Sequence, residues 1–239
     1  MRYFGGKARV AKPLAAFLNN YLNDGQPFVD LFCGSCNVVS KIKGERLRVA
    51  NDLHYELICM HKAVQDNTYK PERVTENEYK TIRDNKSNYE PWRVAFVGFG
   101  LSFSGKYFGG YARCKRGADY FANCVSSTLK KHLTMKDVVF SHGGYDDCFL
   151  PEEALIYCDI PYKGTVGYST GAFSHENFYA WAFQKRGEGY SVLVSEYEHN
   201  VPDGWEVVWR HESKKGIRNK DGVQERTVEV LMRPLVYAR

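Results

Sequence analysis

The alternation of apolar and polar positions predicts an α/β protein in the first third of the chain. Apolar side chains in residues 8–22 recur every three or four positions, which predicts an amphipathic helix. Short apolar runs at 27–32 and 47–52 predict two buried strands, followed by helices at 38–43 and 54–66. This order of strand and helix is typical of the start of a doubly wound parallel sheet.

The same pattern returns in the last third. An apolar run at 154–159 predicts another buried strand, and a helix near 175–185 leads to a further strand at 190–195. Alternating segments at 205–210 and 227–233 predict a closing antiparallel pair. We therefore expect an α/β fold with one doubly wound sheet.

The middle of the chain has a different pattern. Helical spacing occurs there three times, at 78–83, 92–103 and 120–132. No linker rich in Pro or Ser separates this part from the rest. We therefore expect residues 1–66 and 151–239 to form one domain, into which residues 67–150 are inserted as a second, mainly helical domain.

Composition excludes several classes of protein. The 239 residues are 44% apolar and 26% charged, which suits a folded chain long enough to bury a full core. No apolar run approaches the roughly 18 residues of a membrane span, and the N-terminus does not read as a secretory leader. We expect a cytoplasmic protein.

The cysteines and histidines do not form a metal-binding pattern. Of seven cysteines only Cys33 and Cys36 form a CxxC, and no second pair follows at zinc-ribbon spacing. The seven histidines show no spacing typical of a metalloprotease or a zinc deaminase. We expect no metal, and we interpret both residue types as structural.

Positive charge and aromatic residues concentrate in the middle segment. The chain has a net charge of +5 and 15% aromatic residues. Residues 69–136 contain 13 basic and 6 acidic side chains, a net charge of +7, so the remainder is net negative. Basic side chains neutralise phosphates and aromatic rings stack on bases, so this segment favours a nucleic-acid partner. An ordinary solvated surface is the alternative.

A first candidate site follows the first strand. Asp30 ends that strand, and Gly34 lies in the turn behind it, where a backbone without a side chain lets a ligand approach closely. Asp52 ends the next strand, where an acid accepts hydrogen bonds from ribose hydroxyls. The spacing predicts a nucleoside site, although a plain turn capped by an Asp gives the same pattern.

A second candidate site is Asp159-Ile160-Pro161-Tyr162 at a strand end. A flipped base can stack on Tyr162, while Asp159 and the carbonyl of Ile160 accept hydrogen bonds from its exocyclic amine. Two such acceptors would hold adenine's weakly nucleophilic nitrogen in line with a methylsulfonium. Taken alone, this motif favours a plain turn that ends a strand.

Four motifs occur together in the order found in one enzyme family. They are Tyr3-Phe4-Gly5-Gly6-Lys7, Phe28-Val29-Asp30-Leu31-Phe32-Cys33-Gly34-Ser35, Asn51-Asp52-Leu53 with the following His54 to Ile58, and Asp159-Ile160-Pro161-Tyr162. With them the sequence resembles the Dam-like, D12-class DNA adenine-N6 methyltransferases. The resemblance covers most of residues 2–66 and 154–233, and it implies a Rossmann-like methyltransferase sheet with an inserted target-recognition domain.

The resemblance also implies roles for individual residues. The cofactor would be S-adenosylmethionine, held by Tyr3, Lys7, Asp30, Phe32, Gly34, Ser35, Asp52 and Asp159. The catalytic residues would be Asp159, Ile160, Pro161 and Tyr162. Two positions depart from the family pattern, because Ile160 replaces the first Pro of D-P-P-Y and Cys36 replaces a Gly.

The partner implied is double-stranded DNA, with the target adenine flipped out of the duplex. The candidate contacts are Lys106, Tyr107, Phe108, Tyr111, Arg113, Lys115 and Arg116 in the basic aromatic stretch, and Lys214, Lys215 and Arg218 near the C-terminus. We expect a monomer or weak dimer of bacterial or phage origin, acting beside a restriction enzyme or as an orphan methylase.

Two other functions fit part of the pattern. A catalytically inactive DNA-binding relative would retain the basic segment. A protein glutamine-amide methyltransferase would use a motif similar to Asp159–Tyr162, although the N-terminal Gly-Gly-Lys and the basic insertion argue against it.

Overall fold

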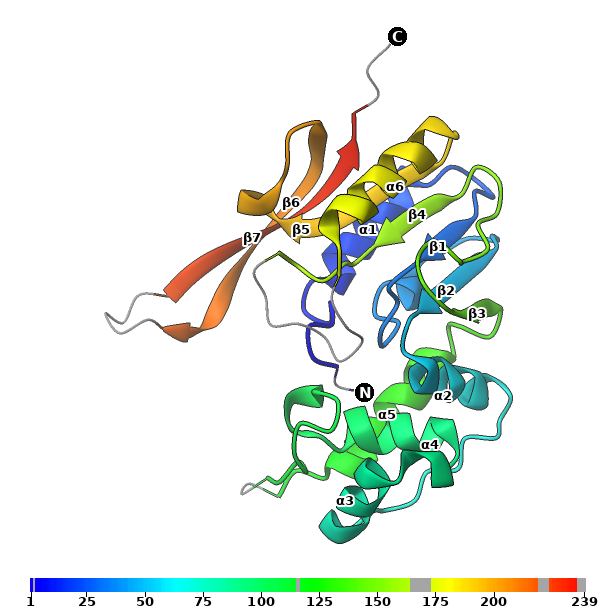
Figure 1. Cartoon of the computed structure of the whole chain (residues 1–239), viewed down its shortest axis with the longest axis vertical. Coiled ribbons are helices and arrows are strands. Elements are labelled where there is room, and N and C mark those ends of the chain that lie inside the picture. The colour runs from blue at the N-terminus through cyan, green and yellow to red at the C-terminus, as the bar shows by residue number, and fades with distance from the viewer. Residues whose placement is uncertain (2, 115–116, 164–172, 219–223, 236–239) are drawn as a thin grey trace.

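The structure is a computed structural model that describes residues 1, 3–114, 117–163, 173–218 and 224–235. Its centre is a seven-stranded sheet in the order β3-β2-β1-β4-β5-β7-β6 (Figure 1). The strands are β1 (Phe28–Asp30), β2 (Arg48–Asp52), β3 (Val138–His142), β4 (Leu155–Cys158), β5 (Ser191–Tyr197), β6 (Trp205–Arg218) and β7 (Gln224–Pro234). The first five are parallel, and β7 runs antiparallel to both β5 and β6.

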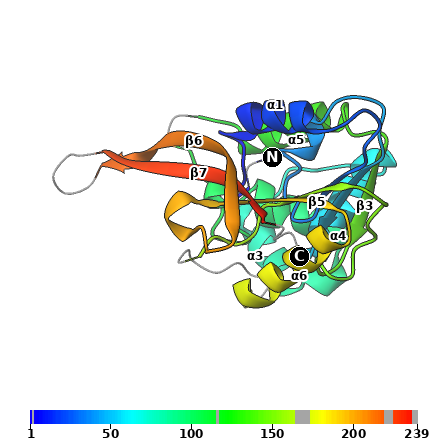
Figure 2. The same cartoon turned by 90° about the horizontal axis from the view of Figure 1, so that it is seen from above.

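Helices cover both faces of this sheet. Leu14 and Leu18 of α1 (Ala11–Tyr21) pack in one apolar cluster with Phe28 of β1. Phe178 of α6 (His175–Gly187) packs in another cluster with Val29, the next residue of β1. Because neighbouring strand residues point to opposite faces, α1 and α6 lie on opposite sides, as Figure 2 shows. The predicted α/β sheet is confirmed.

A group of helices follows β2 and α2 (Tyr55–Gln65). They are α3 (Glu76–Asp84), α4 (Pro91–Ala95), which continues as a π-helical turn to Gly100, and α5 (Tyr120–His132). Tyr79, Ile82 and Phe96 of this group share an apolar cluster with Leu57 and Met60 of α2. The helical group is therefore packed onto the sheet domain through α2.

Two elements differ from the sequence prediction. The expected helix at 38–43 is only a 3₁₀ turn (Val39–Lys41), because the chain turns back at Ile42 and buries that side chain with Val39 below α1. The edge strand β3 was not predicted; it alternates buried Val138 with half-exposed Val139. Since β3 pairs with β2, the sheet takes one strand from the range 67–150. The proposed division into two domains stays a prediction.

The β6–β7 hairpin extends beyond the sheet. Tyr197, the last residue of β5, pairs with Glu229, whereas β6 and β7 go on pairing with each other as far as Arg218 and Gln224. Figures 1 and 2 show this hairpin projecting away from the rest of the molecule. No helix in the described ranges is long and apolar enough to cross a membrane.

Candidate active site

The N-terminal segment lies across the turn that follows β1. Gly34 in this turn has a φ of +47°, and a Cβ at this position would come within 2.9 Å of the Tyr3 ring. Tyr3 in turn lies 5.0 Å from Phe99, measured between ring centroids. Glycine is needed here both for the backbone conformation and for the close approach of the aromatic ring.

Cys36, which stands where the family pattern has a glycine, lies in a backbone region that favours glycine. Its φ is +57°, in the left-handed region, and its backbone N–H donates to the Cys33 carbonyl at 2.7 Å. Its thiol is fully buried and lies 3.4 Å from Nε2 of His61. The turn therefore holds one residue with a Cβ in a strained backbone region.

Asp52 joins the ends of the two neighbouring strands. Its Oδ2 accepts the Gly34 N–H at 2.8 Å, and its Oδ1 accepts the His54 N–H at 2.8 Å. Burial raises the pKa of this carboxyl, and the two backbone hydrogen bonds oppose that shift. A carboxylate oxygen can accept more than one hydrogen bond, so Asp52, which lines the cavity, retains acceptor capacity of the kind that ribose hydroxyls require.

Asp30 is almost completely buried at the end of β1, with 1% of its surface exposed. Its Oδ1 accepts no hydrogen bond from the described part of the chain. Burial raises the pKa of this carboxyl well above its ordinary value, and the neighbouring Cys36 and Asp159 raise it further. A buried acceptor without a donor is suited to a ligand that brings a positive charge or an N–H.

Lys7 connects the N-terminal segment to the second candidate motif. Its Nζ lies 2.8 Å from Oδ1 of Asp159 and 3.3 Å from Oε2 of Glu229, and it donates to the Tyr162 hydroxyl. Burial alone would lower the pKa of Lys7, but the acids around it, Asp159 foremost, raise it above its ordinary value. Lys7 therefore carries its positive charge inside the site.

Ile160 and Pro161, the other two residues of the second motif, are held by contacts within the fold. Ile160 is 1% exposed and packs in the apolar cluster below α6. The Pro161 carbonyl accepts a hydrogen bond from Nε2 of His175 at 2.8 Å. These two contacts hold the chain where it continues from the end of β4, and the Ile160 side chain fills apolar space.

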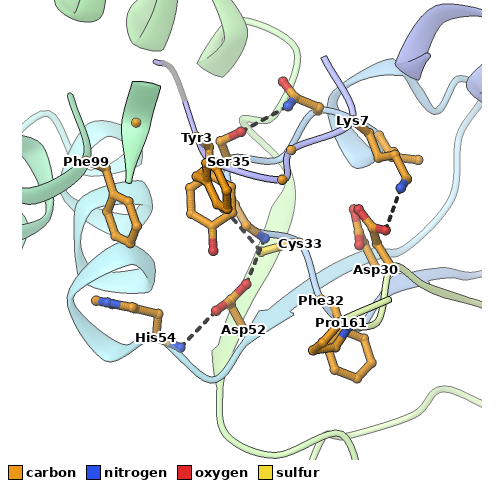
Figure 3. Close-up of a pocket in the computed structure, with 18 of the residues that line it drawn as sticks. Tyr3, Lys7, Asp30, Phe32, Cys33, Ser35, Asp52, His54, Phe99 and Pro161 are labelled. Atoms are coloured by element: carbon orange, nitrogen blue, oxygen red, sulfur yellow. Dashed lines mark hydrogen bonds and ion pairs between the residues drawn. The ribbon is translucent and has the colours of Figure 1, made fainter. Parts of the chain in front are cut away.

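One cavity brings the two candidate sites together. Its lining includes all the residues that the resemblance assigns to the cofactor: Tyr3, Lys7, Asp30, Phe32, Gly34, Ser35, Asp52 and Asp159. Figure 3 shows Lys7 and Asp30 on one side of this cavity and His54 and Phe99 on the other. Pro161 contributes to the wall, whereas Ile160 and Tyr162 are not part of it.

Sequence reasoning missed several residues of the site, four of which have large side chains at or beside the cavity. His54, Phe99 and Phe173 line the cavity, and Glu229 binds Lys7. His54 directly follows the Asp52 motif, so its position was a usable signal. Phe99, Phe173 and Glu229 come from segments far away in sequence, and no local pattern marks them.

The candidate DNA contacts have different surroundings. Lys106 and Tyr107 line the cavity. Phe108 and Tyr111 pack against Tyr79, and the Tyr111 hydroxyl donates to the Val74 carbonyl. The remaining candidate of this stretch that is described, Arg113, is paired with Glu76.

The other candidates lie partly outside the described structure. Lys115 and Arg116 are not among the described residues. Lys214, Lys215 and Arg218 belong to β6 in the projecting hairpin, and only their backbone is described.

Comparison with known families agrees with the motifs. Residues 3–97 match the model of the D12 class N6 adenine-specific DNA methyltransferases. The matched range contains Tyr3, Lys7, Asp30 and Asp52, and ends before Asp159. The resemblance to this family, predicted from the motifs, is thereby confirmed.

A comparison with solved structures finds several methyltransferases that are similar to this chain at a low level. A putative RNA methyltransferase from Pyrococcus horikoshii is 11% identical over 96% of this chain and 83% of that chain, with a TM-score of 0.43. A dimethyladenosine transferase from Plasmodium falciparum is 8% identical over 95% of this chain and 62% of that chain, with a TM-score of 0.41. A precorrin-6y C5,15-methyltransferase from Geobacter metallireducens is 10% identical over 95% and 90%, with a TM-score of 0.39. Similarity at this level carries no information on the substrate of this chain.

The family match indicates S-adenosylmethionine as the cofactor, and the cavity fits that molecule. The unpaired Oδ1 of Asp30 suits its positively charged methionine part, and the lone pairs of Asp52 suit its ribose. The rings of Tyr3 and Phe99 offer an apolar wall to its adenine. The described residues contain no cluster of acids, cysteines and histidines arranged to hold a metal ion.

Proposed function

We propose that this protein methylates the N6 amine of adenine in double-stranded DNA, with the target base turned out of the duplex. The observation that carries the proposal is the position of Asp159. Its carboxylate lies in the same cavity as Asp30 and Asp52, 2.8 Å from the Lys7 ammonium. A nucleoside site and a hydrogen-bond acceptor for an amine thus share one space.

The chemistry of adenine explains why such an acceptor is needed. The lone pair of N6 is delocalised into the ring, so the amine is a poor nucleophile. Asp159 accepts a hydrogen bond from N6, as does the carbonyl of Ile160, and together they hold the amine in one orientation. S-adenosylmethionine, when bound, supplies an electrophilic methyl group on its sulfonium.

Asp159 can also act as the acceptor of the proton that N6 loses on methylation. Burial raises the pKa of this carboxyl above its ordinary value, while Lys7 lowers it. A carboxylate with a raised pKa is a better proton acceptor than an exposed one. Asp159 can therefore take the proton at its free lone pairs without leaving the site.

DNA would be held by basic side chains on two parts of the molecule. The first is the basic aromatic stretch, with Lys106, Tyr107, Phe108, Tyr111, Arg113, Lys115 and Arg116. The second is the β6–β7 hairpin, which carries Lys214, Lys215 and Arg218 beyond the sheet. Phe103, 68% exposed and two residues before Gly105 in the cavity wall, adds an apolar side chain suited to the unstacked duplex.

Transfer of a tritiated methyl group from S-adenosylmethionine tests this function. Unmethylated duplex DNA, RNA of the same sequence and a mixed protein extract are offered in parallel, and labelled nucleosides are separated by mass spectrometry. We expect N6-methyladenine in the DNA, and no label from the Asp159→Ala variant. Label in RNA or in protein glutamine, or in none of the three, contradicts the proposal.

Calorimetry separates an enzyme from an inactive relative. Binding of S-adenosylmethionine to the chain without DNA is expected, because the cavity proposed for it is lined by residues of this chain. If the chain binds DNA but neither binds S-adenosylmethionine nor transfers a methyl group, it is a DNA-binding relative without activity.

A further inference from the structure

Lys7 lies between two carboxylates rather than beside one. Its ammonium is 2.8 Å from Asp159 and 3.3 Å from Glu229, and it is 7% exposed, against 17% and 18% for the two acids. We propose that Glu229 is a positioning residue for the reaction at Asp159. By taking a share of the Lys7 charge, Glu229 leaves Asp159 a negatively charged acceptor for the adenine amine.

The sheet brings Glu229 to this place. Glu229 of β7 pairs with Tyr197, at the end of β5, next to the end of β4 from which Asp159 follows. Leu231, two residues further along β7, packs in the cluster below α1. Because side chains two apart share a face, Glu229 points to the side on which Lys7 leads into α1.

The charges explain why a second acid matters. If Lys7 were paired with Asp159 alone, the pair would be neutral and the carboxylate a weaker acceptor. With Glu229 the three groups have a net charge of −1, and part of it remains on Asp159. Since all three side chains are largely buried, solvent screens this effect little.

A second contact connects Glu229 to the predicted base site. The Tyr162 hydroxyl accepts from Lys7 and donates to Oε2 of Glu229 at 3.4 Å. Its ring lies 4.6 Å from that of Tyr197, nearly perpendicular to it. Glu229 thus also helps to orient the aromatic ring of the catalytic motif.

Charged and titratable groups surround Asp159 on several elements. They are Lys7 on the N-terminal segment, Asp30 on β1, Tyr157 and Cys158 on β4, Tyr162 after β4, Glu196 on β5 and Glu229 on β7. Burial raises the pKa of Asp159, Lys7 lowers it, and Glu229 and then Glu196 raise it again. Removing the charge of Glu229 should therefore lower this pKa.

Nuclear magnetic resonance of ligand-free protein tests the inference directly. Protein with ¹³C-labelled Asp carboxyls is titrated as the wild type, Glu229→Gln and Glu206→Gln, and Asp159→Asn assigns the signal. Glu206 is the matched control, because it is an acid of the same hairpin paired with Arg233 at 2.7 Å. We expect the Asp159 midpoint to fall in Glu229→Gln and to stay in Glu206→Gln; an unchanged midpoint in both overturns the inference.

Kinetics provide the second measurement. The inference rests on the proposed function here, and it predicts that Glu229→Gln lowers kcat at least about tenfold, with the KM for DNA within about threefold of wild type. Calorimetry should give an S-adenosylmethionine Kd within about threefold of wild type. Lower folded stability with unchanged kcat would show a merely structural role and overturn the inference.

A conservative variant covers the case in which Glu229→Gln does not fold. Glu229→Asp keeps the charge but moves it away from Lys7, so its Asp159 midpoint should lie below that of wild type and its kcat should be partly retained. A midpoint equal to wild type overturns the inference. If the wild type methylates no DNA, the proposed function fails, and the titration still decides whether Glu229 tunes Asp159.

Discussion

Asp52 holds two parts of the candidate site together and also lines the cavity. It accepts the N–H groups of Gly34 and His54, both at 2.8 Å, and so fixes the turn after β1 relative to the end of β2. Its oxygens then face the cavity in fixed positions. A ligand that bonds to them does not have to order them first, which favours binding.

Replacing Asp52 by Asn removes one of these two acceptors. The amide NH₂ cannot accept from a backbone N–H, so either Gly34 or His54 keeps an unsatisfied donor. Leaving such a buried group unpaired costs about 1–3 kcal/mol. We expect Asp52→Asn to weaken S-adenosylmethionine binding at least about tenfold, measured by calorimetry. The exposed Asp24→Asn is the control, and equal Kd values for both variants would contradict this role.

Part of the cavity lining could be predicted from sequence, because the residues proposed to hold the cofactor lie in short motifs. Asp30, Gly34 and Asp52 are placed by the ends of neighbouring parallel strands, a rule of the fold. Glu229 and Phe99 could not be predicted in this way. Their positions depend on how β7 pairs with β5 and how the helical group packs on α2, and these are tertiary contacts.

At the scale of elements, the turn after β1 carries backbone strain. Cys36 has a φ of +57° where glycine would be unstrained, and its thiol is buried beside His61. After this turn the chain forms only the 3₁₀ turn Val39–Lys41, so the helix expected at 38–43 is not present. The apolar spacing at 38–43 predicted a helix, but these apolar side chains are instead buried in the cluster below α1.

Comparing Cys36→Gly with Cys36→Ala isolates this strain. Both variants lose the thiol and its contact with His61, so their difference reports on the backbone alone. A left-handed conformation costs a residue with a Cβ about 1–2 kcal/mol, partly offset by the greater freedom of glycine in the unfolded chain. We expect Cys36→Gly to be about 0.5–1 kcal/mol more stable than Cys36→Ala in urea unfolding. Equal stabilities would mean that the turn relaxes.

The β6–β7 hairpin is the element on which DNA binding is most simply tested. Among the described residues, its strands pair only with each other beyond Glu229, and Lys214 and Lys215 lie in that part. We expect Lys214→Ala with Lys215→Ala to weaken binding to all DNA sequences alike. Two lost phosphate contacts should reduce the slope of log K against log salt by about 2, measured by fluorescence anisotropy. Lys12→Ala with Lys62→Ala, two exposed helix positions, is the control; an unchanged slope in the hairpin variant excludes this contact.

Across the whole molecule, the cavity connects parts of the chain that are otherwise separate. The sheet contributes Asp30 and Asp52, the N-terminal segment contributes Tyr3, and the helical group contributes Phe99 and Tyr107. A ligand that filled this cavity would contact all three parts. A ligand that binds only the folded state stabilises that state. Because the cavity lining comes from both the sheet and the helical group, S-adenosylmethionine should stabilise the helical group as well as the sheet.

Hydrogen exchange measured with and without S-adenosylmethionine tests this coupling. At about 100 times Kd the cofactor should add about 2.7 kcal/mol to global stability. Local protection should increase in the turn after β1 and also at Phe96–Gly100, whose only direct connection to the cavity is through Phe99 among the described residues of that turn. The C-terminal end of α6, Lys185–Gly187, lines no part of the cavity and opens by local fraying, so its exchange should stay nearly unchanged. Protection confined to the β1 turn would mean that the helical group moves independently of the cofactor site, and that DNA rather than the cofactor fixes its position.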